Sequence, residues 1–158
     1  DGPRNRLNSR HTSDYRLTDL GRVQASRAGR ILQDRVGSFD KMFCSEYVRA
    51  VETSGHMALP ESNFQTDFLI REQDNGGQKG QTSPLEEYSK ATRPLARWWV
   101  RKGGLGESFA DMCVRLRLFL DQLRDTAAGL RVVVVCHANV IRGFRALLED
   151  VKATEYNE

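Results

Sequence analysis

The pattern of apolar and polar positions predicts helices and short strands that alternate along the chain. Apolar residues at intervals of three or four positions indicate amphipathic helices. We expect helices over about 19–35, 46–57, 85–100 with a break at Pro94, 107–123, and from 138 onwards. Shorter apolar or alternating runs predict strands over 39–45, 65–70 and 132–136. The last of these runs is all apolar and rich in valine, which predicts a central strand covered on both faces.

Particular residues mark where two of the expected helices begin. Thr18 precedes the first helix and is a good N-cap, Asp19 suits the positive first turn, and Gly37 is a typical residue just beyond a helix end. Ser45 follows the apolar core of the first strand and is expected to cap the second helix.

The alternation of helices and strands predicts the fold class. Strands joined by helices run parallel, with helices on both faces of the sheet. We therefore expect an α/β fold, a three-layer αβα sandwich with a mostly parallel central sheet, forming a single domain over residues 1–158. The chain begins in a polar loop without an initiator Met and ends in a polar stretch, so we expect it to be incomplete at both ends.

Composition and charge exclude several classes of partner. Lys and Arg total 24 against 21 Asp and Glu, a net charge of +3 that is too small to argue for a nucleic acid. The cations are mostly arginine, whose guanidinium fork matches the oxygens of a phosphate group. No apolar run approaches the roughly 18 residues that a membrane span needs. The three cysteines are scattered, which favours a reducing, cytoplasmic setting without disulfides.

Chemically distinctive residues follow each of the expected strands, at Ser45–Arg49, at Arg71-Glu72 and at Cys136-His137. Parallel strands present their carboxyl ends at one edge, where ligands of open α/β sheets bind. Each cluster alone is also explained by a surface charge, a helix cap or a core histidine. Only the occurrence of all three at the same edge of the sheet favours a functional site.

Together these groups suit the cleavage of a phosphate ester. Arg49 and His137 are cations that can stabilise a transferring phosphoryl group, and Glu72 is an acid that can protonate the leaving oxygen. The helix expected after His137 presents unpaired N–H groups, at Ala138 among others, that suit a bound phosphate.

Five segments of the chain resemble the histidine phosphatase superfamily, in its phosphoglycerate-mutase-like branch. They occur in the family's order over nearly the whole length, as Leu17–Ala25, Phe43–Thr53, Arg71–Asp74, Gly106–Ser108 and Val135–Arg142. Any one of these short strings is a weak signal, whereas five in the right order are a strong one.

The resemblance implies a mechanism without a metal or a cofactor. A histidine near the N-terminus attacks phosphorus and forms a phosphohistidine, Arg49 and His137 hold the phosphoryl oxygens, and Glu72 protonates the departing alkoxide. A phosphorylated small molecule is the implied substrate. Hydrolysis by water is the preferred outcome, and transfer to a second hydroxyl, as in a phosphomutase, is the alternative. Arg4 and Arg6 lie in the loop that in relatives follows the N-terminal histidine, so they are candidate contacts to the phosphate.

The chain departs from the family pattern at the attacking residue. The family carries it in an Arg-His-Gly tripeptide after the first strand, and this sequence has only Arg10-His11-Thr12, so we assign His11 to a loop and expect the first strand to be missing. The 158 residues alone are expected to be inactive, and a non-catalytic phosphate-binding or partner-binding homologue stays open. Cys136 and Ala138 replace the family's Ser or Thr and its Gly.

A cysteine-dependent phosphatase is a more distant alternative. Cys136 and Arg142 have the spacing of that class, between a buried strand and a helix whose N-terminus would favour a thiolate. The residues between them include no glycine, and that mechanism leaves the other four segments unexplained.

Overall fold

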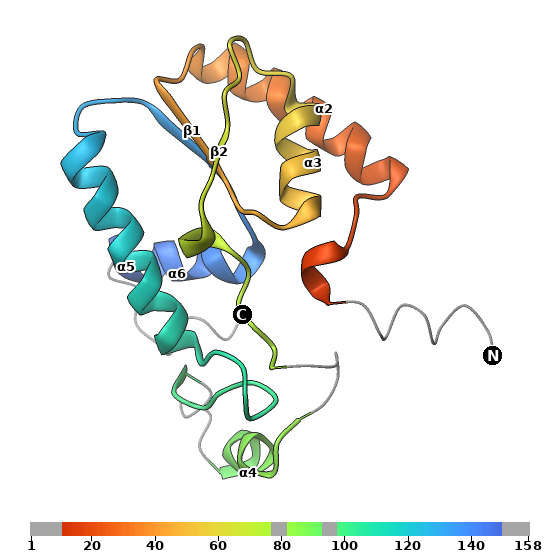
Figure 1. Cartoon of the computed structure of the whole chain (residues 1–158), viewed down its shortest axis with the longest axis vertical. Coiled ribbons are helices and arrows are strands. Elements are labelled where there is room, and N and C mark those ends of the chain that lie inside the picture. Colours follow the sequence, from red (N-terminus) through yellow and green to blue (C-terminus); the bar gives the residue numbers. More distant parts are fainter. Residues whose placement is uncertain (1–10, 77–81, 93–97, 150–158) are drawn as a thin grey trace. The chain divides into compact units, whose positions relative to one another are not determined.

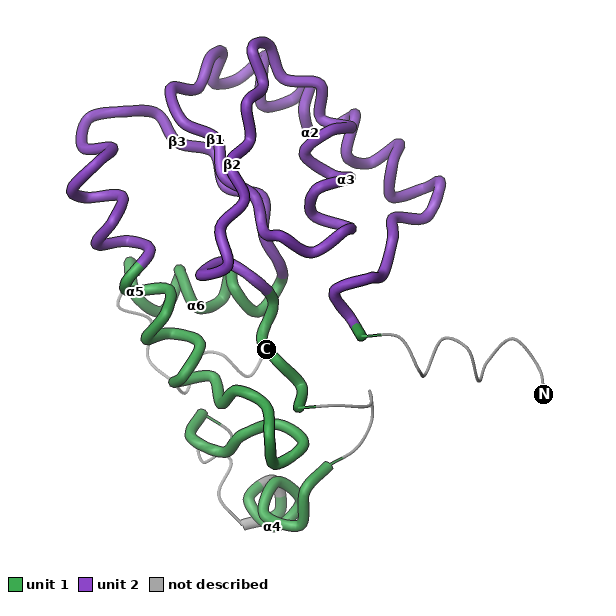
Figure 2. Tube along the Cα trace, viewed as in Figure 1, with its two compact units in different colours: residues 1–11, 72–118, 138–158 green, residues 12–71, 119–137 purple. Residues whose placement is uncertain are grey.

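The computed structural model describes residues 11–76, 82–92 and 98–149, which fall in two compact units (Figure 2). The sheet unit comprises Thr12–Arg71 and Phe119–His137, and the helical unit comprises the rest of the chain. The expectation of a single domain stays a prediction.

The sheet unit contains three parallel strands in the order β2-β1-β3 (Figure 1). They are β1 at Lys41–Cys44, β2 at Gln65–Thr66 and β3 at Val132–Val135. Strands β1 and β3 pair over four residues. This parallel sheet between helices confirms the α/β fold class.

Two expectations about the strands are corrected. The valine run forms an edge strand among the described residues, because β1 and not β3 lies in the middle. An apolar run indicates that the faces of a strand are covered. It does not indicate whether the strand lies in the middle or at the edge of the sheet. The strand expected over 65–70 ends at Thr66, because the Asp67 side chain accepts the N–H of Leu69 at 2.8 Å and starts a short 3-10 helix, η2, at Phe68–Ile70.

Helix α2, at Asp19–Val36, begins and ends where the sequence predicts. The hydroxyl of Thr18 accepts the N–H of Gly21 at 3.1 Å and so satisfies one of the unpaired donors of the first turn. Gly37 closes the helix at a φ of 82°, in the left-handed region that glycine reaches without strain.

Helix α3, at Val48–Met57, begins later than expected, with Tyr47 at the N-cap position. The expectation that Ser45 caps this helix is wrong. Its hydroxyl accepts the N–H of Tyr47 at 3.3 Å, outside the helix, and also bonds to His137. The packing of α3 on α2 is close at Gly29, where an added Cβ would lie 1.9 Å from the carbonyl oxygen of Met57.

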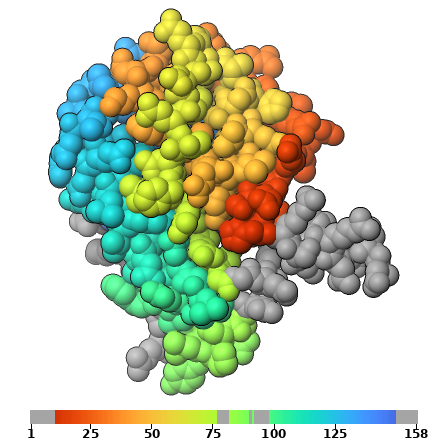
Figure 3. All heavy atoms as spheres, viewed as in Figure 1, coloured from red at the N-terminus to blue at the C-terminus, as the bar shows by residue number. Residues whose placement is uncertain are grey.

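The core of the sheet unit lies on both faces of the sheet. One face packs against α2 and α3 through Met42, Cys44, Ala50, Met57, Leu59, Val133 and Val135, with the partly buried Leu32, Phe39 and Phe64 packed against this cluster. On the other face Phe43 meets Phe119 edge to face, with ring centroids 5.4 Å apart. Phe119 belongs to helix α5, at Phe109–Thr126, so the sheet unit has helix, sheet and helix layers. In the space-filling view, the first segment of the sheet unit, coloured from red to yellow, forms one continuous body (Figure 3).

The helical unit contains α4 at Pro84–Thr92, the first half of α5, and α6 at Ala138–Leu148. Helices α5 and α6 approach closely at Gly143, where an added Cβ would lie 2.5 Å from a methyl group of Leu116. Pro94, expected to break a helix, lies outside the described residues. In the described part of the chain, no helix is both long and apolar enough to cross a membrane.

Candidate functional site

The carboxyl ends of β1 and β3 lie side by side. The N–H of Ser45 donates to the carbonyl of Val135 at 2.9 Å, one residue beyond the strand pairing. Because the strands are parallel, the residues that follow them emerge at the same edge of the sheet.

His137 is held at this edge by Ser45. The His137 Nε2 and the Ser45 hydroxyl oxygen are 2.8 Å apart, and both residues are buried, with 6% and 0% of their surface exposed. The hydroxyl donates to Nε2 in one tautomer, and the N–H of Nε2 donates to the hydroxyl in the other. In either tautomer this bond engages Nε2 and fixes the orientation of the ring.

The ring of Tyr47 contacts both residues that are expected to bind the phosphoryl group, Arg49 and His137. Its centroid is 5.1 Å from that of the His137 ring, and the Cζ atom of Arg49 lies 5.0 Å from it on a face of the ring. Tyr47 is only 4% exposed and Arg49 is half-buried, so the cation–π contact between them is worth about 1 kcal/mol. The structure therefore brings Arg49 and His137 together through one aromatic side chain.

Tyr47 is absent from the residues selected from the sequence. Its position between Ser45 and Arg49 could have identified it. A large aromatic residue between the end of a buried strand and a helix packs beside the side chains at that edge of the sheet.

Arg49 also anchors the segment that precedes α2. Its Nη1 donates to the carbonyl of Thr12 at 2.6 Å, in the 3-10 turn η1 at Thr12–Asp14. One turn further along α3, Glu52 accepts the N–H of Leu17 at 2.7 Å and pairs with Arg16 at 3.0 Å. Helix α3 thus holds this segment at two points.

Replacing Glu52 with Gln is expected to lower the stability of the chain near neutral pH. The N–H of Leu17, and secondarily the charge of Arg16, lower the pKa of Glu52 from its ordinary value of 4.5. A lowered folded-state pKa contributes stability that is present above the unfolded pKa and is lost as the pH falls through the folded one. Denaturant unfolding from pH 7 to pH 3 should therefore show the difference from wild type shrinking below about pH 4.5.

Arg16→Gln is the matched control for this variant. It removes the ion pair and leaves the hydrogen bond from Leu17, so more of the pH dependence should remain than in Glu52→Gln. A stability difference between wild type and Glu52→Gln that stays constant from pH 7 to pH 3 would contradict the assignment.

Glu72 belongs to the helical unit and begins its segment Glu72–Leu118. Its Oε1 accepts the N–H of Gln73 at 2.9 Å, and its carbonyl accepts from Arg115 at 3.3 Å. The meeting of Glu72 with Arg49 and His137 around one anion stays a prediction.

Arg71 ends the sheet unit beside Glu72. Its Nε is buried and has no hydrogen-bond partner, the one such side-chain atom recorded among the described residues.

The other residues selected from the sequence are placed as follows. Ala138 is exposed and opens α6, and His11 is exposed and lies outside any helix or strand. Arg4 lies outside the described residues. At the alternative cysteine site, Cys136 is half-buried, whereas Arg142 is exposed and donates to the side chain of Asn139 at 3.1 Å.

The profile of the Histidine phosphatase superfamily (branch 1) matches residues 3–158. The 2,3-bisphosphoglycerate-dependent phosphoglycerate mutase of Rhizobium etli is 28% identical over 147 residues, which cover 87% of this chain and 70% of that protein. Phosphoglycerate mutase-like protein 4 of Arabidopsis thaliana is 33% identical over 138 residues. These cover 82% of this chain and 58% of the plant protein, so the chain spans less than two thirds of that relative.

A similar fold is found in a solved mycobacterial structure. The glucosyl-3-phosphoglycerate phosphatase in complex with VO3 superimposes with a TM-score of 0.72 at 22% identity. The match covers 96% of this chain and 79% of the mycobacterial chain.

Proposed function

Because the chain belongs to the histidine phosphatase superfamily, we propose that it acts in phosphoryl transfer from a phosphorylated small molecule, by hydrolysis of a phosphomonoester. The observation that carries the proposal is the cluster of Arg49, Tyr47 and His137 at the carboxyl edge of the sheet. Two groups that can carry positive charge are held there by one buried ring, so they are oriented before an anion arrives.

The chemistry divides into two displacements. A histidine nitrogen attacks phosphorus while the ester oxygen leaves, and Glu72 gives that oxygen its proton. Water then attacks the phosphohistidine, its proton passes to the Glu72 carboxylate, and the P–N bond breaks to release inorganic phosphate and the free histidine. Arg49 and His137 stabilise the charge on the phosphoryl oxygens in both steps. The sequence contains no Arg-His-Gly tripeptide, so the proposal assigns the attack to none of His11, His56 and His137.

A phosphomutase is the second candidate, because the bacterial relative at 28% identity is named a phosphoglycerate mutase. The full-length protein, incubated with 3-phosphoglycerate and with a series of other phosphomonoesters, distinguishes the two activities. Hydrolysis releases inorganic phosphate, whereas a mutase redistributes the phosphoryl group between hydroxyls. In either case an acid-labile phosphoryl label on the protein supports phosphohistidine.

The remaining alternatives give different results in the same experiment. Binding of inorganic phosphate by the full-length protein without any turnover would favour a phosphate-binding homologue. Loss of activity both on thiol alkylation and in Cys136→Ser would favour the cysteine mechanism, whereas an active Cys136→Ser variant would exclude it.

Glu72→Gln is expected to lower kcat for the hydrolysis of alkyl phosphates by about 10²- to 10⁴-fold, the range for loss of a general acid. An alkoxide needs the proton as it leaves, whereas p-nitrophenolate leaves readily without it, so p-nitrophenyl phosphate should be affected much less. Steady-state kcat on both substrates measures the difference. Equal losses on the two substrates would contradict the role of Glu72 as proton donor.

A further inference from the structure

A buried ion pair in the helical unit joins Glu107 to Arg115. The Nε of Arg115 lies 2.7 Å from Oε1 of Glu107, and its Nη2 lies 2.9 Å from Oε2, so both oxygens of the carboxylate are engaged. Arg115 is 9% exposed. A two-point pair between planar groups fixes direction as well as distance.

The same two residues hold the backbone of 72–74. The Nη2 of Arg115 donates to the carbonyl of Glu72 at 3.3 Å, and Oε2 of Glu107 accepts the N–H of Asp74 at 3.0 Å. The backbone of Glu107 adds two bonds, because its N–H donates to the carbonyl of Asp74 at 2.9 Å and its carbonyl accepts the side chain of Gln73 at 3.1 Å.

Helix α5 provides the rigid support for this network. Ser108 and Asp111 form a reciprocal cap, in which the Ser108 hydroxyl accepts the N–H of Asp111 at 3.0 Å and the Asp111 carboxylate accepts the N–H of Ser108 at 3.1 Å. Glu107 directly precedes this cap, and Arg115 lies two turns into the helix. The position of 72–74 is therefore set by the start of α5.

The carboxyl group of Glu72 is part of the same chain of contacts. Its Oε1 accepts the N–H of Gln73, and Gln73 is 3% exposed and itself bonded to Glu107. A shift of the 72–74 backbone would therefore turn the carboxyl group of Glu72.

We propose that Glu107 and Arg115 are positioning residues that aim the carboxyl group of Glu72 at the leaving oxygen. This inference rests on the proposed role of Glu72 as proton donor. The ion pair touches neither substrate nor reacting atoms and acts through the backbone of Glu72 and Asp74. The proton is carried by Oε2 of Glu72, because Oε1 is tied to the N–H of Gln73.

The test compares Arg115→Lys and Glu107→Gln in the full-length protein on an alkyl phosphate and on p-nitrophenyl phosphate. A single ammonium group does not span both carboxylate oxygens and the Glu72 carbonyl. The amide of Glu107→Gln has one acceptor oxygen, whereas the carboxylate accepts three N–H bonds. We expect kcat on the alkyl phosphate to fall by about 10- to 100-fold, the scale of a small misplacement at a reacting group. We expect kcat on p-nitrophenyl phosphate to fall by less than about threefold, because its leaving group needs little help from the acid.

The ratio of the two rates separates a positioning role from a structural one. Partial unfolding lowers both rates in one sample by the same factor and leaves the ratio unchanged. Arg124→Gln is the matched control, because it removes exposed ion pairs with Asp121 and Asp125 on the same helix and should not alter the ratio. Glu107→Gln retains one acceptor oxygen and is the milder variant should Arg115→Lys fold poorly.

The outcomes distinguish this inference from the proposed function. An unchanged ratio in both variants, with Glu72→Gln selective for the alkyl phosphate, would overturn the positioning role alone. Equal losses in Glu72→Gln on both substrates would overturn the proposed acid, and the positioning role with it. Selective losses in Glu72→Gln and in both positioning variants, with Arg124→Gln unchanged, would support both.

Discussion

Replacing Arg49 with Ala is expected to lower the phosphoryl-transfer rate of the full-length protein by about 10²- to 10³-fold, the scale for a lost donor to a developing charge. His137→Ala should cause a loss of the same order. Both side chains are held against the buried ring of Tyr47, so neither has to reorganise when the charge on the phosphoryl oxygens develops. Single-turnover rates with one phosphomonoester, measured on both variants, test the expectation.

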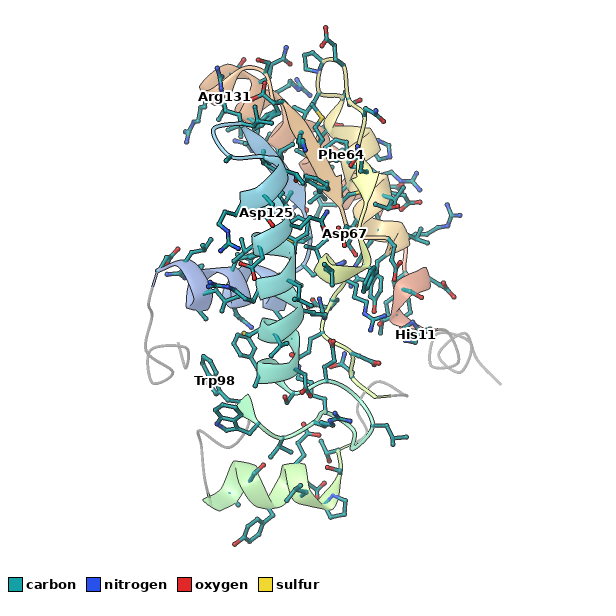
Figure 4. All side chains as sticks on the ribbon, turned by 60° about the vertical axis from the view of Figure 1, so that its left-hand side comes forward. His11, Phe64, Asp67, Trp98, Asp125 and Arg131 are labelled. Carbon is teal, nitrogen blue, oxygen red and sulfur yellow. The ribbon has the colours of Figure 1, made fainter. Side chains whose placement is uncertain are left out.

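Arg131→Ala is the control for these two variants. Arg131 directly precedes β3, so it lies at the amino ends of the strands, opposite to His137 (Figure 4). Its guanidinium donates to the carbonyl of Val36. The variant should therefore retain the wild-type rate. Rates in Arg49→Ala and His137→Ala equal to that of wild type would refute the assignment of the phosphate-binding groups.

Gly29→Ala is expected to destabilise the chain by about 1–3 kcal/mol or more, as an overpacked core does. The new methyl group would lie 1.9 Å from the carbonyl oxygen of Met57 and 2.7 Å from its Cα. These are backbone atoms at the end of α3, so they have no rotamer by which to move away. The two helices would have to separate. This strain destabilises the folded state only, so the free energy of unfolding decreases.

Gly55→Ala is the matched control within α3. Apart from its chain neighbours and the backbone of its own helix, no heavy atom of the described residues lies within 4 Å of its added Cβ. The helix propensity of alanine should therefore stabilise the chain by about 0.5–1 kcal/mol. Denaturant unfolding of both variants measures the contrast. Similar free energies of unfolding for Gly29→Ala and wild type would show that α2 and α3 adjust without strain.

Elements defined by local chemistry were predictable from the sequence. Helix α2 begins and ends as expected, because the Thr18 cap and the closing Gly37 act on neighbouring backbone groups. The order of the strands was not predictable in the same way. The composition of Val132–Val135 indicates covered faces, whereas its edge position depends on β1 pairing with both other strands.

The candidate site shows the same division. The sequence selected Arg49, Glu72 and His137 from residue type and from position after strands, and their roles stay predictions. It assigned Ser45 to a helix cap, because a serine before a helix is a local signal, whereas the bond to His137 joins residues 92 positions apart.

The sequence by itself determined the family, the parallel α/β class and the residue types that can handle a phosphate, because these follow from short motifs and from periodicity. Only the tertiary structure decided that Tyr47 joins Arg49 to His137, and that Glu107 and Arg115 hold the backbone of 72–74. Most of these contacts join side chains or backbone groups that are distant along the chain. Their partners are selected by how the helices and strands pack, and no local pattern encodes that choice.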